Sequence, residues 1–163
     1  MQQICGRFPP SLLTLHLTGR QLTDVRPLSM LVGLTTLHLS SWQIWDVSPL
    51  SSLVNLNTLT LSSCTHLRPI RLWDVSPLSP LIRLHTLNLR SCSEVADLRP
   101  LSALAALRSL DLSYFPQLTD VRPLSALVGL LSLDLTYCHR LSDVSPLSSL
   151  VGLRTLDLRN CEQ

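Results

Sequence analysis

The sequence predicts an α/β solenoid: a right-handed horseshoe with a parallel β-sheet on its concave face and short helical or 3-10 turns on its convex side. Three observations predict this fold class. The pattern Leu-x-x-Leu-x-Leu recurs seven times in 163 residues. A second pattern, Asp-Val-x-Pro-Leu and its close variants, follows six of these copies. The composition is 45% hydrophobic but only 4% aromatic, so stacked aliphatic side chains must form the core.

The Leu-x-Leu segments are the expected strands, because alternating apolar and polar residues give a strand with one buried face. The first leucines of the copies are Leu12, Leu34, Leu56, Leu84, Leu107, Leu130 and Leu153. Successive copies are therefore 22, 22, 28, 23, 23 and 23 residues apart. One strand alone cannot bury its leucines. Copies stacked about 4.8 Å apart would form a parallel sheet over a continuous core.

The second half of each repeat is expected to turn the chain back. A proline suits the first position of a short helical turn, and the prolines in question are Pro27, Pro49, Pro77, Pro100, Pro123 and Pro146. Ser48, Ser76 and Ser145 are expected to cap three of these turns. The motif aspartates are expected to accept backbone N–H groups; they are Asp24, Asp46, Asp74, Asp97, Asp120 and Asp143. Catalysis by these carboxylates is the alternative, but a residue repeated at every turn favours a structural role.

The full consensus is L-x-x-L-x-L-x-x-C-x-x-L-x-D-V-x-P-L-S-x-L-x-x-L, and it covers roughly residues 12–161. This pattern resembles the leucine-rich repeat family. The Asp-Val-x-Pro-Leu half resembles the short repeats of bacterial internalins and of phosphatase-regulatory proteins. The Ser-Cys-x-x-Leu-x-Asp-Val-Ser-Pro-Leu-Ser phrase is similar to leucine-rich repeat proteins of trypanosomatids. The resemblance implies a non-catalytic module that binds protein partners.

The last copy ends at Leu-Arg-Thr-Leu-Asp-Leu-Arg-Asn-Cys-Glu-Gln and has no return motif. Solenoids usually need polar caps at both ends, so Leu153, Leu156 and Leu158 are expected to be under-covered. We therefore expect residues 1–163 to form one repeat domain that is a fragment of a longer array. Further repeats, a cap or a partner would then cover its C-terminal end.

Four of the five cysteines lie three residues after the last strand leucine: Cys64, Cys92, Cys138 and Cys161. The family usually carries asparagine there, so these thiols are expected to fill a buried site and donate weakly to backbone. Disulfides between neighbouring copies suit parallel side-chain vectors poorly. A zinc site with His66 and His139 has only weak spacing. Reduced thiols favour a reducing intracellular compartment.

Polar columns on the concave face are the first candidate site. One column reads His16, His38, Thr60, Asn88, Asp111, Asp134 and Asp157. Its three aspartates would lie about 5 Å apart and repel by about 1 kcal/mol per pair even in water. The stripe either stays solvated, as a simple duplication of repeats would leave it, or attracts a basic protein partner.

A neighbouring column adds to this surface, and it reads Thr18, Ser40, Ser62, Arg90, Ser113, Thr136 and Arg159. We expect it to project from the sheet too, with Arg90 and Arg159 near enough to pair with the carboxylates. Tyr114 and Tyr137 follow one position later, and tyrosine is favoured in interface hot spots. The leading predicted partner-binding residues are therefore Asp111, Tyr114, Asp134, Tyr137, Asp157, Arg90 and Arg159.

A five-residue insertion gives the second candidate site. Leu61 and Asp74 are thirteen residues apart, whereas Leu89 and Asp97 are eight apart. Either Leu67 or Leu72 would keep the inward position. The predicted cluster of cations and aromatic rings comprises Trp45, Trp73, Arg68 and Arg71. The alternative is that the tryptophans only cover apolar surface under a tolerated loop.

The sequence favours no enzyme, cofactor or metal. It has no Gly-rich phosphate loop, metalloprotease helix motif or nucleophile elbow. A net charge of +2 with dispersed arginines is not typical of nucleic-acid binding, and no stretch approaches the ~20 apolar residues of a membrane span. The predicted function is a protein-binding scaffold of the intracellular regulatory or adaptor type. The alternative, which the internalin resemblance implies, is a cell-surface adhesin.

Overall fold

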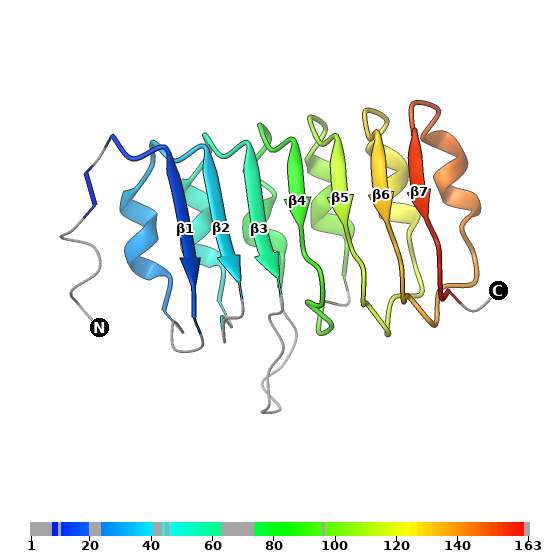
Figure 1. Cartoon of the computed structure of the whole chain (residues 1–163). Helices are drawn as coiled ribbons and strands as arrows, with labels where there is room; N and C mark the ends of the chain where they lie inside the picture. The colour runs from blue at the N-terminus through cyan, green and yellow to red at the C-terminus, as the bar shows by residue number, and fades with distance from the viewer. Residues whose placement is uncertain are drawn as a thin grey trace.

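The computed structural model describes residues 8–9, 11–19, 24–40, 44, 46–62, 74–95 and 97–161. Seven parallel strands form one sheet in chain order, each hydrogen-bonded to the next. The strands are β1 Thr14–Thr18, β2 Thr36–Ser40, β3 Thr58–Ser62, β4 Thr86–Asn88, β5 Ser109–Asp111, β6 Ser132–Asp134 and β7 Thr155–Asp157. Figure 1 shows the sheet as one layer with the return turns behind it. The predicted repeat solenoid is confirmed.

The register stacks each leucine on its counterpart in the next repeat. Leu37 lies opposite Leu59, which lies opposite Leu87, and the row continues through Leu110 and Leu133. All five side chains are at most 1% exposed. Complete burial of a leucine contributes about 1.5–3 kcal/mol, so rows of this kind are the main source of stability in a fold with few aromatic residues.

Every return turn is a short 3-10 helix. The turns are η2 Arg26–Met30, η3 Ser48–Ser52, η4 Ser76–Leu78, η5 Arg99–Ala103, η6 Arg122–Ala126 and η7 Ser145–Ser149. Proline is their second residue, not the first as predicted. The prediction that Ser48, Ser76 and Ser145 cap the turns is wrong. Each is instead the first residue of its turn, and the preceding valine occupies the cap position without a side-chain hydrogen bond.

The motif aspartates perform the capping. In all six copies the carboxylate accepts the N–H of the residue two positions later at 2.8–2.9 Å, as predicted. Where that residue is arginine, its guanidinium also binds the carboxylate, as in the 2.7 Å contact between Arg99 Nη2 and Asp97 Oδ2. These hydrogen bonds from Arg99 hold the pKa of Asp97 below its ordinary value. The contacts explain the recurrence of aspartate as a structural device.

The C-terminal end of the sheet is less well covered than its interior. Leu156 in β7 is 41% exposed, and Leu153 and Leu158 are half-buried. The equivalent leucines of β6 are fully buried because β7 and its flanks cover them. The predicted under-coverage of this end is confirmed.

Candidate functional site

The last residue of each C-terminal strand closes a local turn. The side-chain oxygen of Asn88, Asp111, Asp134 or Asp157 accepts the N–H of the residue two positions later. The donors are Arg90 at 2.9 Å, Ser113 at 2.9 Å, Thr136 at 2.8 Å and Arg159 at 3.1 Å. Asparagine and aspartate favour such turns because their short side chains reach this N–H. The strand therefore ends at this residue in β4 to β7.

The residue after each turn adopts a left-handed backbone. The residues are Ser91 (φ 61°), Tyr114 (φ 62°), Tyr137 (φ 62°) and Asn160 (φ 59°). Asparagine tolerates this region, whereas an ordinary L-residue there costs about 1–2 kcal/mol. Tyr114 and Tyr137 are thus held in a costly conformation, and their side chains are still 37% and 38% exposed.

These tyrosines form a row of planar groups along the solenoid. Tyr114 and Tyr137 stack with their ring centroids 4.4 Å apart and an angle of 16° between the planes. The guanidinium carbon of Arg90, from the preceding repeat, lies 4.4 Å from the Tyr114 centroid. His139 meets Tyr137 edge-on at 5.9 Å. Stacking and cation–π contacts each contribute roughly 0.5–1.5 kcal/mol, which offsets part of the backbone strain.

The aspartates lie in register beside this row, because Asp111 pairs with Asp134 and Asp134 with Asp157. Asp111 also accepts hydrogen bonds from Asn88 Nδ2 at 2.9 Å and from Ser113 Oγ at 2.7 Å. The predicted column is therefore confirmed, and its three aspartates are half-buried.

The charges in the column are not all balanced. Asp157 forms an ion pair with Arg159, with 2.6 Å between Oδ2 and Nη2. The hydrogen bonds from Arg159 keep the pKa of Asp157 below its ordinary value. Within the described residues, neither Asp111 nor Asp134 has an ion pair, and only the more distant charge of Arg159 acts on Asp134.

Two solved structures are similar to the chain. One is an internalin (inlF) from Listeria monocytogenes, 29% identical, with a TM-score of 0.64, covering 85% of this chain. The other is an internalin C2 (inlC2) from the same organism, 30% identical, with a TM-score of 0.59, covering 91% of this chain. The chain belongs to the leucine-rich repeat proteins. It spans 45% of the first internalin and 72% of the second. No family model and no curated protein matches it.

In this leucine-rich repeat chain, the contacts of the two predicted arginines differ. Arg159 pairs with a carboxylate as expected. Arg90 instead donates to Ser113 Oγ at 3.2 Å and covers the ring of Tyr114. The other predicted cluster, Trp45, Arg68, Arg71 and Trp73, lies outside the described residues, as do Leu67 and Leu72. That cluster therefore stays a prediction.

The expectation that the whole neighbouring column, Thr18 to Arg159, projects from the sheet is wrong at two positions. Ser113 is fully buried and Thr136 is only 6% exposed. Both follow an aspartate that closes a turn, and the turn draws their N–H groups inward. The sequence did contain an indication of these turns, because Asp-x-Ser and Asp-x-Thr are typical of a turn that the aspartate side chain closes. The sequence reasoning also missed His139 as a neighbour of Tyr137.

The described cysteines of the column are weak donors, as predicted, whereas Cys64 lies outside the described residues. The thiols of Cys92, Cys138 and Cys161 lie 2.8, 3.4 and 3.1 Å from the carbonyl oxygens of Leu61, Leu112 and Leu135. These carbonyls belong to the preceding repeat in each case. The thiols of Cys138 and Cys161 are free, and burial raises the pKa of the Cys138 thiol to about 12. Among the residues described, no cluster of three or more His, Cys, Asp or Glu is arranged to hold a metal.

The N-terminal half of the same face carries imidazoles. His16 and His38 stack at 4.3 Å with an angle of 20° between the rings. His38 Nδ1 is 2.8 Å from Thr60 Oγ1. Burial, and then the neighbouring His16, lower the pKa of His38. This half therefore has stacked rings without the carboxylates and the exposed tyrosines of the other half.

Proposed function

We propose that this leucine-rich repeat chain is a non-catalytic module that binds a protein partner through its strand-end surface. We define that surface as Arg90, Asp111, Tyr114, Asp134, Tyr137, Asp157 and Arg159. The observation that carries the proposal is the row formed by Arg90, Tyr114 and Tyr137. The likeness to two internalins supports a module of the protein-binding kind.

Three properties of the row support a binding role. Tyrosine and arginine are enriched in interface hot spots because they bury a large area with a polar end. Tyr114 and Tyr137 remain more than a third exposed despite a left-handed backbone, and costly local conformations cluster at functional sites. The carboxylates of Asp111 and Asp134, which have no ion pair within the described residues, favour basic side chains on the partner.

The tyrosines are tested by affinity capture from cells of the source organism, followed by quantitative mass spectrometry. The double change Tyr114→Ser and Tyr137→Ser is expected to reduce the captured partner about tenfold or more, the size of a hot spot's contribution. The matched control is His16→Ser with His38→Ser, which removes another stacked pair from the same face. Equal capture by wild-type and the tyrosine variant would refute the surface.

The negative charges of the three strand-end aspartates are tested with a variant that keeps the fold. Changing Asp111, Asp134 and Asp157 together to Asn keeps an oxygen that can close each turn and removes three negative charges. We expect this variant to abolish capture of a basic partner. Unchanged capture, with circular dichroism showing an intact fold, would assign the aspartates a purely structural role.

The second predicted contact is the cluster of Trp45, Arg68, Arg71 and Trp73, near the insertion. We propose it as an accessory contact for the same partner. Removing the five-residue excess by deleting residues 68–72 is expected to weaken capture without unfolding the repeats. Undiminished capture would leave the insertion a tolerated loop.

We propose an intracellular regulatory or adaptor role, which the free, buried thiol of Cys138 supports because such compartments keep cysteines reduced. The alternative role is a cell-surface adhesin, and the likeness to internalins favours it. Immunostaining of source cells with and without permeabilisation separates them. Staining that requires permeabilisation supports the adaptor, and staining of intact cells supports the adhesin.

A further inference from the structure

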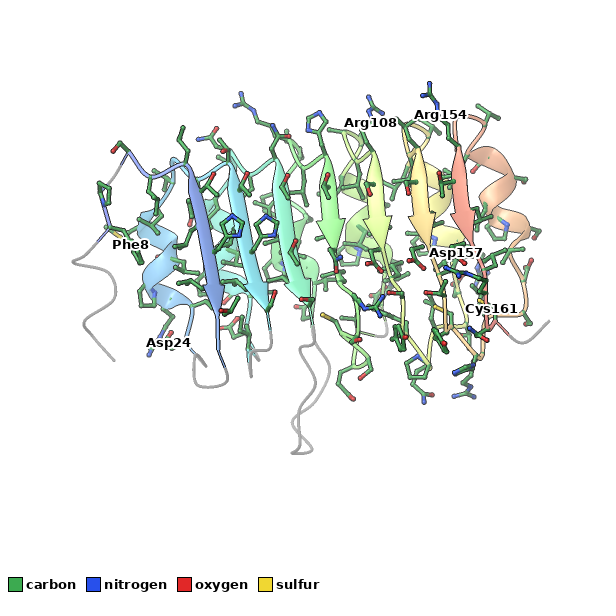
Figure 2. The ribbon with its side chains drawn as sticks, viewed as in Figure 1. Phe8, Asp24, Arg108, Arg154, Asp157 and Cys161 are labelled. Carbon is green, nitrogen blue, oxygen red and sulfur yellow. The ribbon has the colours of Figure 1, made fainter. Side chains whose placement is uncertain are left out.

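The connections that enter strands β2 to β7 form a continuous edge of the molecule. The last five residues before each of these strands are residues 31–35, 53–57, 81–85, 104–108, 127–131 and 150–154. Each closes with a backbone turn and donates to the preceding repeat, as in Leu34 N to Leu31 O and Thr35 N to Leu13 O, both 2.9 Å. Figure 2 shows Arg108 and Arg154 at this edge, away from Asp157 and Cys161 near the other ends of the strands. The edge is therefore a regular, well-bonded surface.

The charge on this edge is of one sign. Its six segments contain Arg83, His85, Arg108 and Arg154 but no aspartate or glutamate. The chain has 13 arginines and 11 acidic residues, so without these three arginines it would have 10 and 11, a net charge of −1. These three arginines thus exceed the net charge of +2 of the whole chain, and we call this edge the basic edge.

The arginines of the basic edge have no carboxylate partner. In the described part of the chain, the ion pairs involve Arg26, Arg99, Arg122 and Arg159. By contrast, Arg83 Nη1 donates to Asn55 Oδ1 at 3.1 Å, and Arg108 Nη1 donates to the Gly129 carbonyl at 2.7 Å. These bonds fix the position of a guanidinium without neutralising it. All three edge arginines are exposed.

Exposed aliphatic side chains run along the same edge. The second residue of each connection, except Ala105, is a branched aliphatic residue with high exposure: Val32 (55%), Val54 (46%), Ile82 (63%), Val128 (63%) and Val151 (91%). Single exposed apolar residues are common on protein surfaces, but a row at one position of successive repeats is a contiguous feature of the kind that marks interaction sites. We call it the aliphatic row.

We infer that the basic edge and the aliphatic row together dock an acidic amphipathic segment of a protein partner. Its carboxylates would bind Arg83, Arg108 and Arg154, and its apolar side chains would lie on the aliphatic row. A helix rises 5.4 Å per turn, close to the ~4.8 Å between neighbouring strands, so successive turns can meet successive repeats. The site lies at the strand ends opposite the strand-end surface and does not depend on it.

The probe is a fluorescent 16-residue peptide with leucine and glutamate at helical spacing, titrated by anisotropy at low salt. The triple change Arg83→Gln, Arg108→Gln and Arg154→Gln is expected to weaken binding about tenfold or more, since exposed charge pairs are individually weak and three are lost. The matched control, Arg26→Gln with Arg99→Gln and Arg122→Gln, changes net charge equally and should retain binding. Circular dichroism establishes that both variants are folded.

Two further measurements separate the proposal from simple charge attraction. Changing Ile82, Val128 and Val151 to Thr should weaken peptide binding several-fold, because threonine keeps the branched shape at Cβ but puts a hydroxyl where the apolar contact was. The Tyr114→Ser, Tyr137→Ser variant should bind the peptide like wild-type, so a failed strand-end surface would not affect this result. Equal losses in both arginine variants, or no loss with threonine, would overturn the proposal. Tighter edge-dependent binding of single-stranded DNA or anionic vesicles than of the peptide would overturn it too.

Discussion

The two halves of the sheet share a core but differ at their strand ends. Strands β1, β2 and β3 have five residues each, whereas β4, β5, β6 and β7 have three. The third strand residue is histidine or threonine in the first half and asparagine or aspartate in the second. In the described residues, only the second group accepts the N–H two positions later.

This difference accompanies a change in repeat length. The motif aspartate Asp46 comes seven positions after the last strand leucine, Leu39, whereas Asp97 comes eight positions after Leu89. The side-chain–closed turn and the left-handed residue after it accommodate the additional residue. The closed turns therefore occur together with the shorter strands, the longer repeats and the left-handed residues Tyr114 and Tyr137.

The largest expected loss of stability follows from truncating a core leucine, and it should be the same in both halves of the sheet. Leu59 in β3 is fully buried and Leu110 in β5 is 1% exposed. Changing either to Ala should lower the free energy of unfolding by about 3 kcal/mol, within the usual 2–5 kcal/mol for a buried leucine. Urea denaturation of both variants checks this. A difference of more than about 1.5 kcal/mol between them would mean that the halves differ in their cores as well.

The second prediction compares the stability lost when the third strand residue is changed to alanine, and this loss should differ between the halves. Asp111→Ala removes the acceptor of the Ser113 N–H, the Ser113 hydroxyl and the Asn88 amide. Because Ser113 is buried, its unsatisfied groups should cost about 2 kcal/mol. Thr60→Ala removes only the contact with His38 and should cost about 0.5–1 kcal/mol. Chemical denaturation with Asp111→Asn as the control, which retains an acceptor, gives the comparison; equal losses at residues 60 and 111 would contradict it.

The sequence sufficed for the core, the register and the aspartate-capped turns because these depend on patterns repeated in every copy. Leu37, Leu59 and Leu110 occupy positions that the repeat alone determines. The strand-end turns could not be read in the same way. Asp111 in Leu-Asp-Leu is compatible both with a solvated strand position and with a turn, and only the burial of Ser113 decides between them. The row of arginines at the opposite edge was missed because Arg83 and Arg108 occupy different positions in their repeats.

Glycine substitutions should change the free energy of unfolding in opposite directions in the two halves. Ser91 has a φ of 61°, where glycine avoids the steric cost of a side chain. Ser91→Gly should therefore raise the unfolding free energy by about 0.5 kcal/mol, after the entropy gained by the unfolded chain is subtracted. Ser40 lies in the regular strand β2, and Ser40→Gly should lower it by about 1 kcal/mol. Thermal and urea denaturation measure both values, and the same sign for both would refute a left-handed turn at Ser91.

The smallest effect is the pH response, and it too should differ between the halves. The pKa of His38 is lowered by burial and by His16, so the unfolded chain binds a proton more readily than the folded one. The contribution of neutral His38 to stability is complete above the ordinary histidine pKa of 6.5. This contribution is lost as the pH falls through the pKa of His38 in the folded chain. The Asp157 pKa lies below 3.8 because of Arg159, so that contribution persists at pH 5 and is lost only in stronger acid.

Amide hydrogen exchange resolves this response strand by strand. Between pH 7.5 and pH 5, after correction for intrinsic exchange rates, protection should fall in β1 to β3 and stay constant in β5 to β7. His38→Asn removes the titrating ring and should abolish the loss in the N-terminal strands. A uniform loss along the sheet would show that the two halves unfold as one cooperative unit, and the difference at their strand ends would then be one of geometry and not of local stability.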